Sequence, residues 1–192
     1  MEMERYAEEH RVPIMQLPGI EGLLQILRVH KPEKILEVGS AIGYSAIRMA
    51  EALPCSSIVT IERDPERAEK AREYIATSDY QERIYLIEGD ALEVKQDQLI
   101  FQQFDAIFID AAKGQYRRFF DLYAPLLSED GAIYCDNMYM HGMAVKDVND
   151  IPRKNRTMIR KLKDFTQWIL DHPDYHSALL PVGDGLLICT KK

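Results

Sequence analysis

The stretch ILEVGSAIGYS, residues 35–45, decides the fold class of this chain. The apolar run 34–38 predicts a short buried strand, and residues 44–53 have the pattern of a helix that Pro54 ends. The glycines of the turn 39–43 let a ligand approach the backbone, and the next helix offers free N–H groups at its start. The spacing is GxxxG rather than GxGxxG, and no P-loop lysine follows. The ligand predicted here therefore does not need to carry a phosphate.

Strands and helices alternate on both sides of this turn. Apolar runs predict further strands at 58–61, 83–88, 105–109, 131–135, about 175–181 and 185–190. Helices are predicted at 20–30, from Asp64-Pro65 onward, at 114–127 and at 153–171, with a long loop at 138–152. Such alternation is typical of an α/β doubly wound sheet, and the last two strands should form an antiparallel hairpin around Gly183-Asp184-Gly185. We expect a single domain over residues 1–192.

The composition excludes several classes of protein. With 46% hydrophobic and 29% charged residues, the chain is not expected to be disordered. A net charge of −7 argues against a globally basic nucleic-acid binder, although it leaves room for a local basic patch. The three cysteines (Cys55, Cys135 and Cys189) form no CxxC pair, which argues against a disulfide framework and a structural zinc site. No signal peptide or membrane span is recognisable, so we expect a cytoplasmic protein without membrane partners.

Two acidic positions follow strands next to the glycine turn. Glu62 ends the second strand, where a carboxylate can accept hydrogen bonds from both hydroxyls of a ribose. Asp90 and Ala91 follow the third strand and border the same crevice, where an adenine could lie. The alternatives are a solvated surface glutamate and a plain turn. Together with the glycine turn, Glu62 favours the ribose role.

Oxygen-bearing side chains follow the fourth and fifth strands. Asp110 ends the fourth strand, and Asp136 and Asn137 end the fifth. The carboxyl ends of these strands should lie together, and such an all-oxygen set suits Mg²⁺, Ca²⁺ or Mn²⁺. The alternative is capping of strand ends by Asx residues. Lys113, expected at a helix N-terminus near the cation, is a candidate general base; the alternative, and the usual case for such a residue, is a surface lysine.

These motifs together resemble a known family. The segments that carry the resemblance are ILEVGSAIGYSAIRMA (35–50), IERDPE (61–66), IEGDA (87–91), FDAIFIDAAKGQY (104–116) and CDNM (135–138). They are similar to the cation-dependent O-methyltransferases that use S-adenosylmethionine, the group that includes catechol and caffeoyl-CoA methyltransferases. The resemblance covers about residues 13–192. It implies a Rossmann-like class I methyltransferase fold, with a seven-stranded sheet whose last strand is antiparallel.

The resemblance also implies roles for individual residues. The expected S-adenosylmethionine contacts are Met15, Glu37, Gly39, Ser45, Glu62, Asp90, Ala91 and Asp110. The expected ligands of Mg²⁺, Mn²⁺ or Ca²⁺ are Asp110, Asp136 and Asn137, and the expected catalytic residues are Lys113 and Asp110. By analogy with the family, a homodimer is expected.

A basic segment bears on which molecule accepts the methyl group. On a helix, Arg156, Arg160 and Lys163 would share one face, and the stretch 151–156 is similar to the bacterial members that methylate 5-hydroxyuridine at the tRNA wobble position. The predicted partner is therefore the tRNA anticodon region. The candidate contacts are Arg117, Arg118, Arg153, Lys154, Arg156 and Arg160. The alternatives are a solvated helix face, with a small catechol or phenolic metabolite as acceptor, and a non-catalytic binding protein on the same scaffold.

Overall fold

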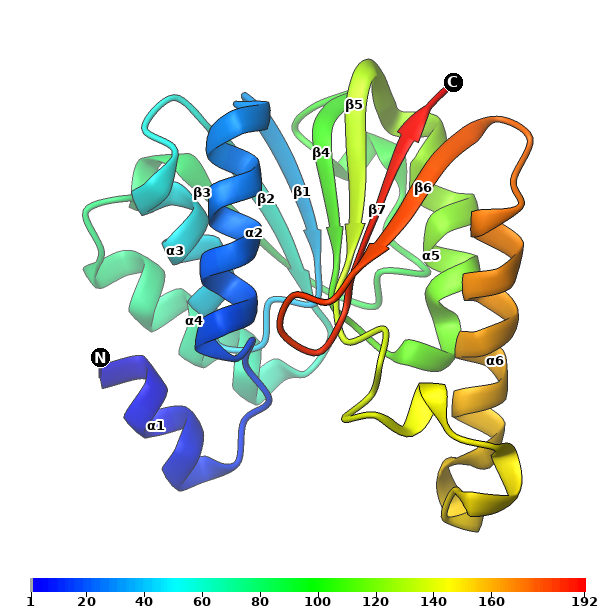
Figure 1. Cartoon of the computed structure of the whole chain (residues 1–192). Coiled ribbons are helices and arrows are strands. Elements are labelled where there is room, and N and C mark those ends of the chain that lie inside the picture. The colour runs from blue at the N-terminus through cyan, green and yellow to red at the C-terminus, as the bar shows by residue number, and fades with distance from the viewer. Residues whose placement is uncertain (1) are drawn as a thin grey trace.

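Seven strands of residues 2–192, the part of the chain that the computed structural model describes, form one sheet in the order β3-β2-β1-β4-β5-β7-β6 (Figure 1). The strands are β1 (Lys34–Val38), β2 (Ser57–Glu62), β3 (Ile84–Glu88), β4 (Phe104–Ile109), β5 (Leu127–Cys135), β6 (Tyr175–Leu180) and β7 (Leu186–Lys191). Strands β1 to β5 are parallel, whereas β7 is antiparallel to both β5 and β6. The predicted Rossmann-like α/β sheet with an antiparallel last strand is confirmed.

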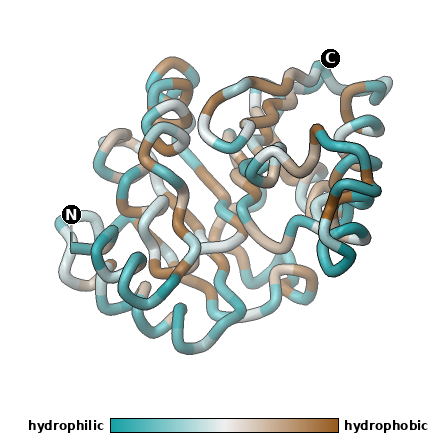
Figure 2. The backbone as a smooth tube through the Cα atoms, turned by 60° about the horizontal axis from the view of Figure 1, so that its bottom comes forward, coloured by the Kyte–Doolittle hydropathy of each residue, from teal (hydrophilic) through white to brown (hydrophobic). Residues whose placement is uncertain are grey.

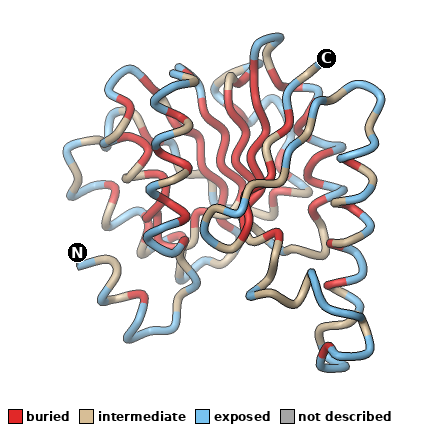
Figure 3. The backbone as a smooth tube through the Cα atoms, in the orientation of Figure 1, coloured by how far each residue is buried: buried red, intermediate tan, exposed pale blue. Residues whose placement is uncertain are grey.

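The helices cover both faces of the sheet. They are α1 (Glu2–His10), α2 (Leu17–His30), α3 (Tyr44–Ala52), α4 (Pro65–Thr77), α5 (Tyr116–Tyr123) and α6 (Arg153–Leu170). Successive strand residues point to opposite faces, so Ile35 packs with α2, α3 and α4, whereas Leu36 packs with α5 and α6. Figure 3 shows the central strands buried between these two layers, and Figure 2 shows hydrophilic segments on the outside.

Local sequence signals explain where several helices begin. The side chain of Asp64 accepts hydrogen bonds from the backbone N–H groups of Glu66 and Arg67, both at 3.1 Å, and Pro65 opens α4 as predicted. Helix α2 begins at Leu17, three residues earlier than predicted. Pro18 lies in its first turn, where the fixed φ of proline fits a helix and no N–H is needed.

Two predicted segments near the site differ in the structure. The helix predicted at 114–127 is a 3₁₀ turn (Lys113–Gln115) followed by α5, which ends at Tyr123 because Pro125 cannot continue an α-helix. Strand β5 therefore starts at Leu127 instead of 131. The apolar spacing of the sequence predicts Ile159, Leu162, Thr166 and Ile169 as the buried face of α6; in the structure Phe165 is buried in place of Thr166, whose hydroxyl donates to the Leu162 carbonyl.

The N-terminal helix α1, which the sequence analysis did not predict, docks on α3 and α4. The ammonium group of Lys70 lies 4.9 Å from the ring centroid of Tyr6 and 4.8 Å from that of Tyr74. The hydroxyl of Tyr44 donates to a carboxylate oxygen of Glu4 at 2.7 Å. These contacts hold α1 in place, and the chain that follows it brings Met15 to the carboxyl end of the sheet. None of the described helices is both long and apolar enough to span a bilayer.

Candidate active site

A cleft of about 970 Å³ lies at the carboxyl ends of the parallel strands. Its walls come from the segment before α2, the turn between β1 and α3, the ends of β2, β3 and β4, and the loop after β5. Ligands of open α/β sheets bind at this edge. Of the predicted site residues, those that line the cleft are Met15, Gly39, Ser45, Glu62, Asp90, Ala91, Asp110, Lys113, Asn137 and Arg118.

Gly39 occupies the closest approach between the ends of β1 and β4. Its φ is +102°, and a Cβ atom built on it would lie 2.4 Å from the carbonyl oxygen of Asp110. The backbone N–H of Asp110 donates to the Val38 carbonyl at 2.9 Å, which holds the two strand ends together. Only glycine fits this position, because it combines a left-handed backbone with no space for a side chain.

The carboxylate of Glu62 is oriented by backbone groups. It accepts a hydrogen bond from the N–H of Ala41 at 2.8 Å and another from the N–H of Asp64 at 2.9 Å. Its side chain reaches the cleft from the end of β2. Next to it, the hydroxyl of Ser40 is buried and has no hydrogen-bond partner among the described residues, although Ser40 lines the cleft. A buried polar atom without a partner at a cleft wall fits a polar ligand group there.

Asp90 and Ala91 shape the next part of the wall. The carboxylate of Asp90 accepts from the N–H of Leu92 at 2.9 Å, and the hydroxyl of Tyr123 donates to the Ala91 carbonyl at 2.6 Å. Both contacts fix the chain at the end of β3 where it borders the cleft.

Glu37, predicted as a cofactor contact, lies behind the cleft wall and does not line it. It is fully buried and accepts hydrogen bonds from the hydroxyls of Ser45 and Thr60, the latter at 2.5 Å. Burial raises the pKa of Glu37 to about 7, against the two hydrogen bonds, which act to lower it. Glu37 thus supports the glycine turn from inside, and the Ser45 hydroxyl is directed toward it.

The buried carboxyl of Glu37 makes stability depend on pH. Because its folded-state pKa lies above the ordinary value of 4.5, its contribution is complete below pH 4.5 and is lost as the pH rises to about 7. We expect the free energy of unfolding of Glu37→Gln to rise relative to that of the wild type by up to about 3 kcal/mol as the pH increases across this range. Urea unfolding at several pH values measures the difference. Glu129→Gln, at an 88% exposed side chain, is the control, and parallel pH profiles for wild type and Glu37→Gln would contradict the expectation.

The predicted metal ligands meet at the ends of β4 and β5. Asp110 forms an ion pair with Lys113, and Asp136 accepts the side-chain N–H of Asn137 at 2.9 Å. The other carboxylate oxygen of Asp136 is buried without a partner among the described residues. Burial and the charge of Asp110 raise the pKa of Asp136 to about 7.

This donor set fits a hard cation. Nowhere in residues 2–192 do three or more His, Cys, Asp or Glu side chains gather as a metal site, and the predicted set itself contains two carboxylates and one amide. An unpartnered buried oxygen beside a second carboxylate is nevertheless an arrangement that a divalent cation would stabilise. All the candidate donors are oxygens, which suits Mg²⁺ better than zinc.

Lys113 stands in the 3₁₀ turn before α5, not at the start of an α-helix as predicted. Its ammonium group contacts the carboxylate of Asp110 and lies 5.5 Å from the ring centroid of Tyr116. Its side chain is largely buried but still reaches the cleft. The amine of Lys113 therefore lies where it can exchange a proton with a group bound in the cleft.

The predicted basic residues do not converge on the cleft. Of the six candidates, Arg118 alone lines it. Arg117 lies 3.5 Å from the ring centroid of Trp168, and Arg156, in the first turn of α6, donates to the carbonyls of Asn149 and Ile151 in the loop before that helix. The remaining three, Arg153, Lys154 and Arg160, are exposed on α6.

Several lining residues were missed in the sequence analysis. They are Ser40, Arg63, Arg67 and His141. Ser40 could have been found from its position next to Gly39. His141 could not, because its place depends on contacts with the distant turn between β6 and β7.

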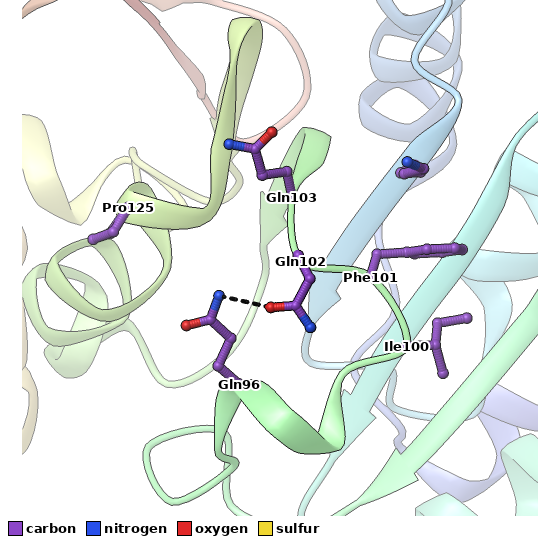
Figure 4. A pocket seen from close by; sticks show the side chains of 7 residues that line it. Gln96, Ile100, Phe101, Gln102, Gln103 and Pro125 are labelled. Carbon is purple, nitrogen blue, oxygen red and sulfur yellow. Dashed lines mark hydrogen bonds between the residues drawn. The ribbon is translucent and has the colours of Figure 1, made fainter.

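A second cavity, of about 580 Å³, lies at the opposite edge of the sheet (Figure 4). Amide side chains line it, including Gln96 and Gln102, which hydrogen bond at 3.4 Å, together with apolar groups. Lys34 is the one charged side chain among the described residues that line it. None of the predicted site residues takes part, so the chemistry concentrates at the carboxyl edge.

The strand order, the antiparallel β7 and the cleft beside Gly39 and Glu62 define the class of Rossmann-like methyltransferases. Comparison with known families agrees. The O-methyltransferase family model matches residues 1–192, and the chain belongs to this family. The predicted enzyme class, an S-adenosylmethionine-dependent O-methyltransferase, is confirmed.

Individual relatives support this assignment. A caffeoyl-CoA O-methyltransferase of Populus kitakamiensis is 27% identical over 184 residues, covering 92% of this chain and 78% of the relative. A Staphylococcus aureus crystal structure with the provisional name caffeoyl-CoA O-methyltransferase is 34% identical, with a TM-score of 0.92 over 99% of this chain and 90% of that one. The S-adenosylhomocysteine-bound methyltransferase PaMTH1 of Podospora anserina is 29% identical, with a TM-score of 0.78 over 90% of this chain and 77% of its own.

Proposed function

We propose that this enzyme transfers the methyl group of S-adenosylmethionine to one of two adjacent oxygens of a small phenolic acceptor, in the presence of a divalent cation. The observation that carries the proposal is the buried, unpartnered oxygen of Asp136, which does not itself line the cleft but interacts with Asp110 and precedes Asn137, both of which do. A donor set of this kind suits a cation that chelates two neighbouring oxygens.

The cofactor residues follow the strand order. Bound S-adenosylmethionine would supply an electrophilic methyl group. In this proposal the carboxylate of Glu62 accepts the ribose hydroxyls, while Asp90 and Ala91 border the adenine. Gly39, Ser45 and Met15 form the wall for the methionine end, with Glu37 supporting Ser45 from behind.

The reaction residues lie across the cleft. Asp110, Asp136 and Asn137 would hold the cation, which when bound acts as a Lewis acid and makes the acceptor hydroxyl more acidic. With Asp110 engaged by the cation, the ammonium group of Lys113 would first release a proton to solvent, and the neutral amine, which reaches the cleft, would then take the proton of that hydroxyl. The remaining role of the chain is to hold the acceptor oxygen near the methyl group and to exclude water, so that positioning supplies much of the rate.

The comparisons favour the phenolic acceptor over the tRNA predicted from the basic segment. The relatives include caffeoyl-CoA O-methyltransferases and a flavonoid 3',5'-methyltransferase of Vitis vinifera, 26% identical over 98% of this chain. The guanidinium group of Arg156 is also bound to carbonyls of the loop before α6, which weakens the predicted tRNA-binding face. The single domain, the homodimer and the cytoplasmic location are predictions from the sequence. Light scattering on the purified protein tests the homodimer.

Methylation assays test this function. Purified protein is incubated with labelled S-adenosylmethionine, Mg²⁺ and one of three acceptors: catechol, resorcinol or tRNA that carries 5-hydroxyuridine. We expect label on catechol, background on resorcinol because its oxygens are not adjacent, and loss of catechol methylation on addition of EDTA. Methylation of tRNA without methylation of catechol would overturn the proposed acceptor, and activity that survives EDTA would overturn the cation requirement.

A further inference from the structure

The turn between β6 and β7 is fastened to the loop that follows β5. Figure 1 shows this turn at the carboxyl edge of the sheet, between the start of α2 and the loop after β5. The turn contains Gly183-Asp184-Gly185, which the proposed reaction does not use. The loop after β5 contributes Asn137, Met140 and His141 to the cleft wall.

Asp184 and its neighbour bind three backbone N–H groups of that loop. The N–H of Met138 donates to the Gly185 carbonyl at 3.0 Å, and the N–H of Tyr139 donates to the Asp184 carbonyl at 2.8 Å. The N–H of His141 donates to both carboxylate oxygens of Asp184, at 2.8 and 2.9 Å. The side chain of Asp184 is 11% exposed, so water competes little for these bonds.

The loop needs such support because its backbone is unfavourable on its own. Asn137, Met140 and His141 have φ values of +57°, +46° and +53°, followed by Gly142 at +78°. The left-handed region is disfavoured for side chains larger than glycine, and it is least disfavoured for asparagine. Met140 and His141 therefore keep this conformation only where the surroundings hold it.

Close packing leaves the turn little freedom to move away. A Cβ atom on Gly185 would lie 2.9 Å from the ring of Tyr139, and one on Gly183 would lie 2.6 Å from the Cα atom of Gly19 in α2. The turn is thus wedged between the loop and the helix that follows Met15, and its position sets that of the loop.

We propose that Asp184 is a positioning residue for the acceptor side of the site. Its carboxylate holds the His141 backbone and, through it, the strained segment that presents Met140 and His141 to the acceptor and continues from Asn137. The part of this inference that concerns the acceptor rests on the proposed function. The cofactor side, formed by Gly39 and Glu62, does not depend on this carboxylate.

Three measurements on the full chain test the role of Asp184: hydrogen exchange of the loop amides, the Kd for S-adenosylmethionine, and the KM for catechol. We expect Asp184→Ala to accelerate exchange in residues 138–145 and to raise the catechol KM by about tenfold, with the cofactor Kd changed by less than about twofold. Asp184→Asn keeps one acceptor oxygen, so its loop exchange rates and its catechol KM should lie between those of wild type and those of Asp184→Ala. This variant also provides the test if Asp184→Ala does not fold. Asp130→Ala, exposed on β5 at the opposite edge, is the matched control.

The outcomes separate this proposal from the proposed function. Exchange needs no acceptor: unchanged loop exchange, or an acceleration spread evenly over the sheet, would overturn the role of Asp184 whatever the substrate is. An equal loss of cofactor and catechol affinity would also overturn it, because it would indicate general unfolding. If wild type methylates no catechol, the proposed function fails, while faster exchange confined to the loop still supports the positioning by Asp184.

Discussion

Replacing Asp136 with asparagine is expected to abolish most of the activity while making the cation-free protein more stable. The variant removes a carboxylate from the proposed cation site, and we expect kcat to fall by about a thousandfold or more. It also removes a buried charge that lies near Asp110 and has one oxygen without a partner among the described residues. We expect a gain of about 1–3 kcal/mol in the free energy of unfolding without a cation.

Thermal unfolding with and without Mg²⁺ measures both effects. Wild type should gain Tm when Mg²⁺ is added, and Asp136→Asn should not, because a ligand stabilises only a protein that binds it. Asp105→Asn is the matched control: Asp105 accepts from the N–H groups of Glu33 and Lys34 and from the Ser128 hydroxyl, so it should lose stability and keep the Mg²⁺ response. A loss of stability in Asp136→Asn would contradict the proposed site.

Gly39→Ala is expected to destabilise the protein by about 4 kcal/mol or more. The added Cβ would meet the Asp110 carbonyl oxygen at 2.4 Å, and neither backbone segment can withdraw without breaking the contact between β1 and β4. The φ of +102° adds conformational strain. Because small domains have only about 5–15 kcal/mol of stability, a loss of this size should leave much of the Gly39→Ala protein unfolded at elevated temperature.

A second glycine separates collision from backbone strain. Gly142 has a φ of +78°, but no atom lies within 4 Å of the place that a Cβ would take there, so Gly142→Ala should cost only about 1 kcal/mol. Urea unfolding of both variants gives the comparison. If the two variants unfold at the same urea concentration, the close approach of β1 and β4 is not what requires glycine at position 39.

The predictions from sequence were most accurate where a short segment carries its own signal. The glycine turn at 39–43, the Asp64-Pro65 cap and the final hairpin follow from neighbouring residues, and the structure has each of them. The helix predicted at 114–127 was confirmed only over α5, and its predicted end was wrong because Pro125 cannot continue an α-helix. The predicted face of α6 included Thr166 instead of Phe165, since which residue is buried depends on the partners Tyr116 and Phe120.

Some residues of the site could likewise be placed from the sequence, and others could not. Residues at strand ends, such as Glu62 and Asp110, could be placed at one edge of the sheet from the order of the strands alone. The position of Glu37 behind the wall could not, because the glutamate of a buried strand can face the cleft or the core, and the hydroxyls of Ser45 and Thr60 decide between them.

The sequence by itself determined the α/β class, the methyltransferase family and the strand-end oxygens, because these depend on local periodicity, turn residues and order along the chain. The tertiary structure alone decided that Gly39 meets Asp110, that one Asp136 oxygen stays unpartnered, and that Asp184 holds the loop of His141. Each of these is a contact between segments far apart in the chain, and such contacts exist only once the sheet has brought the strand ends together.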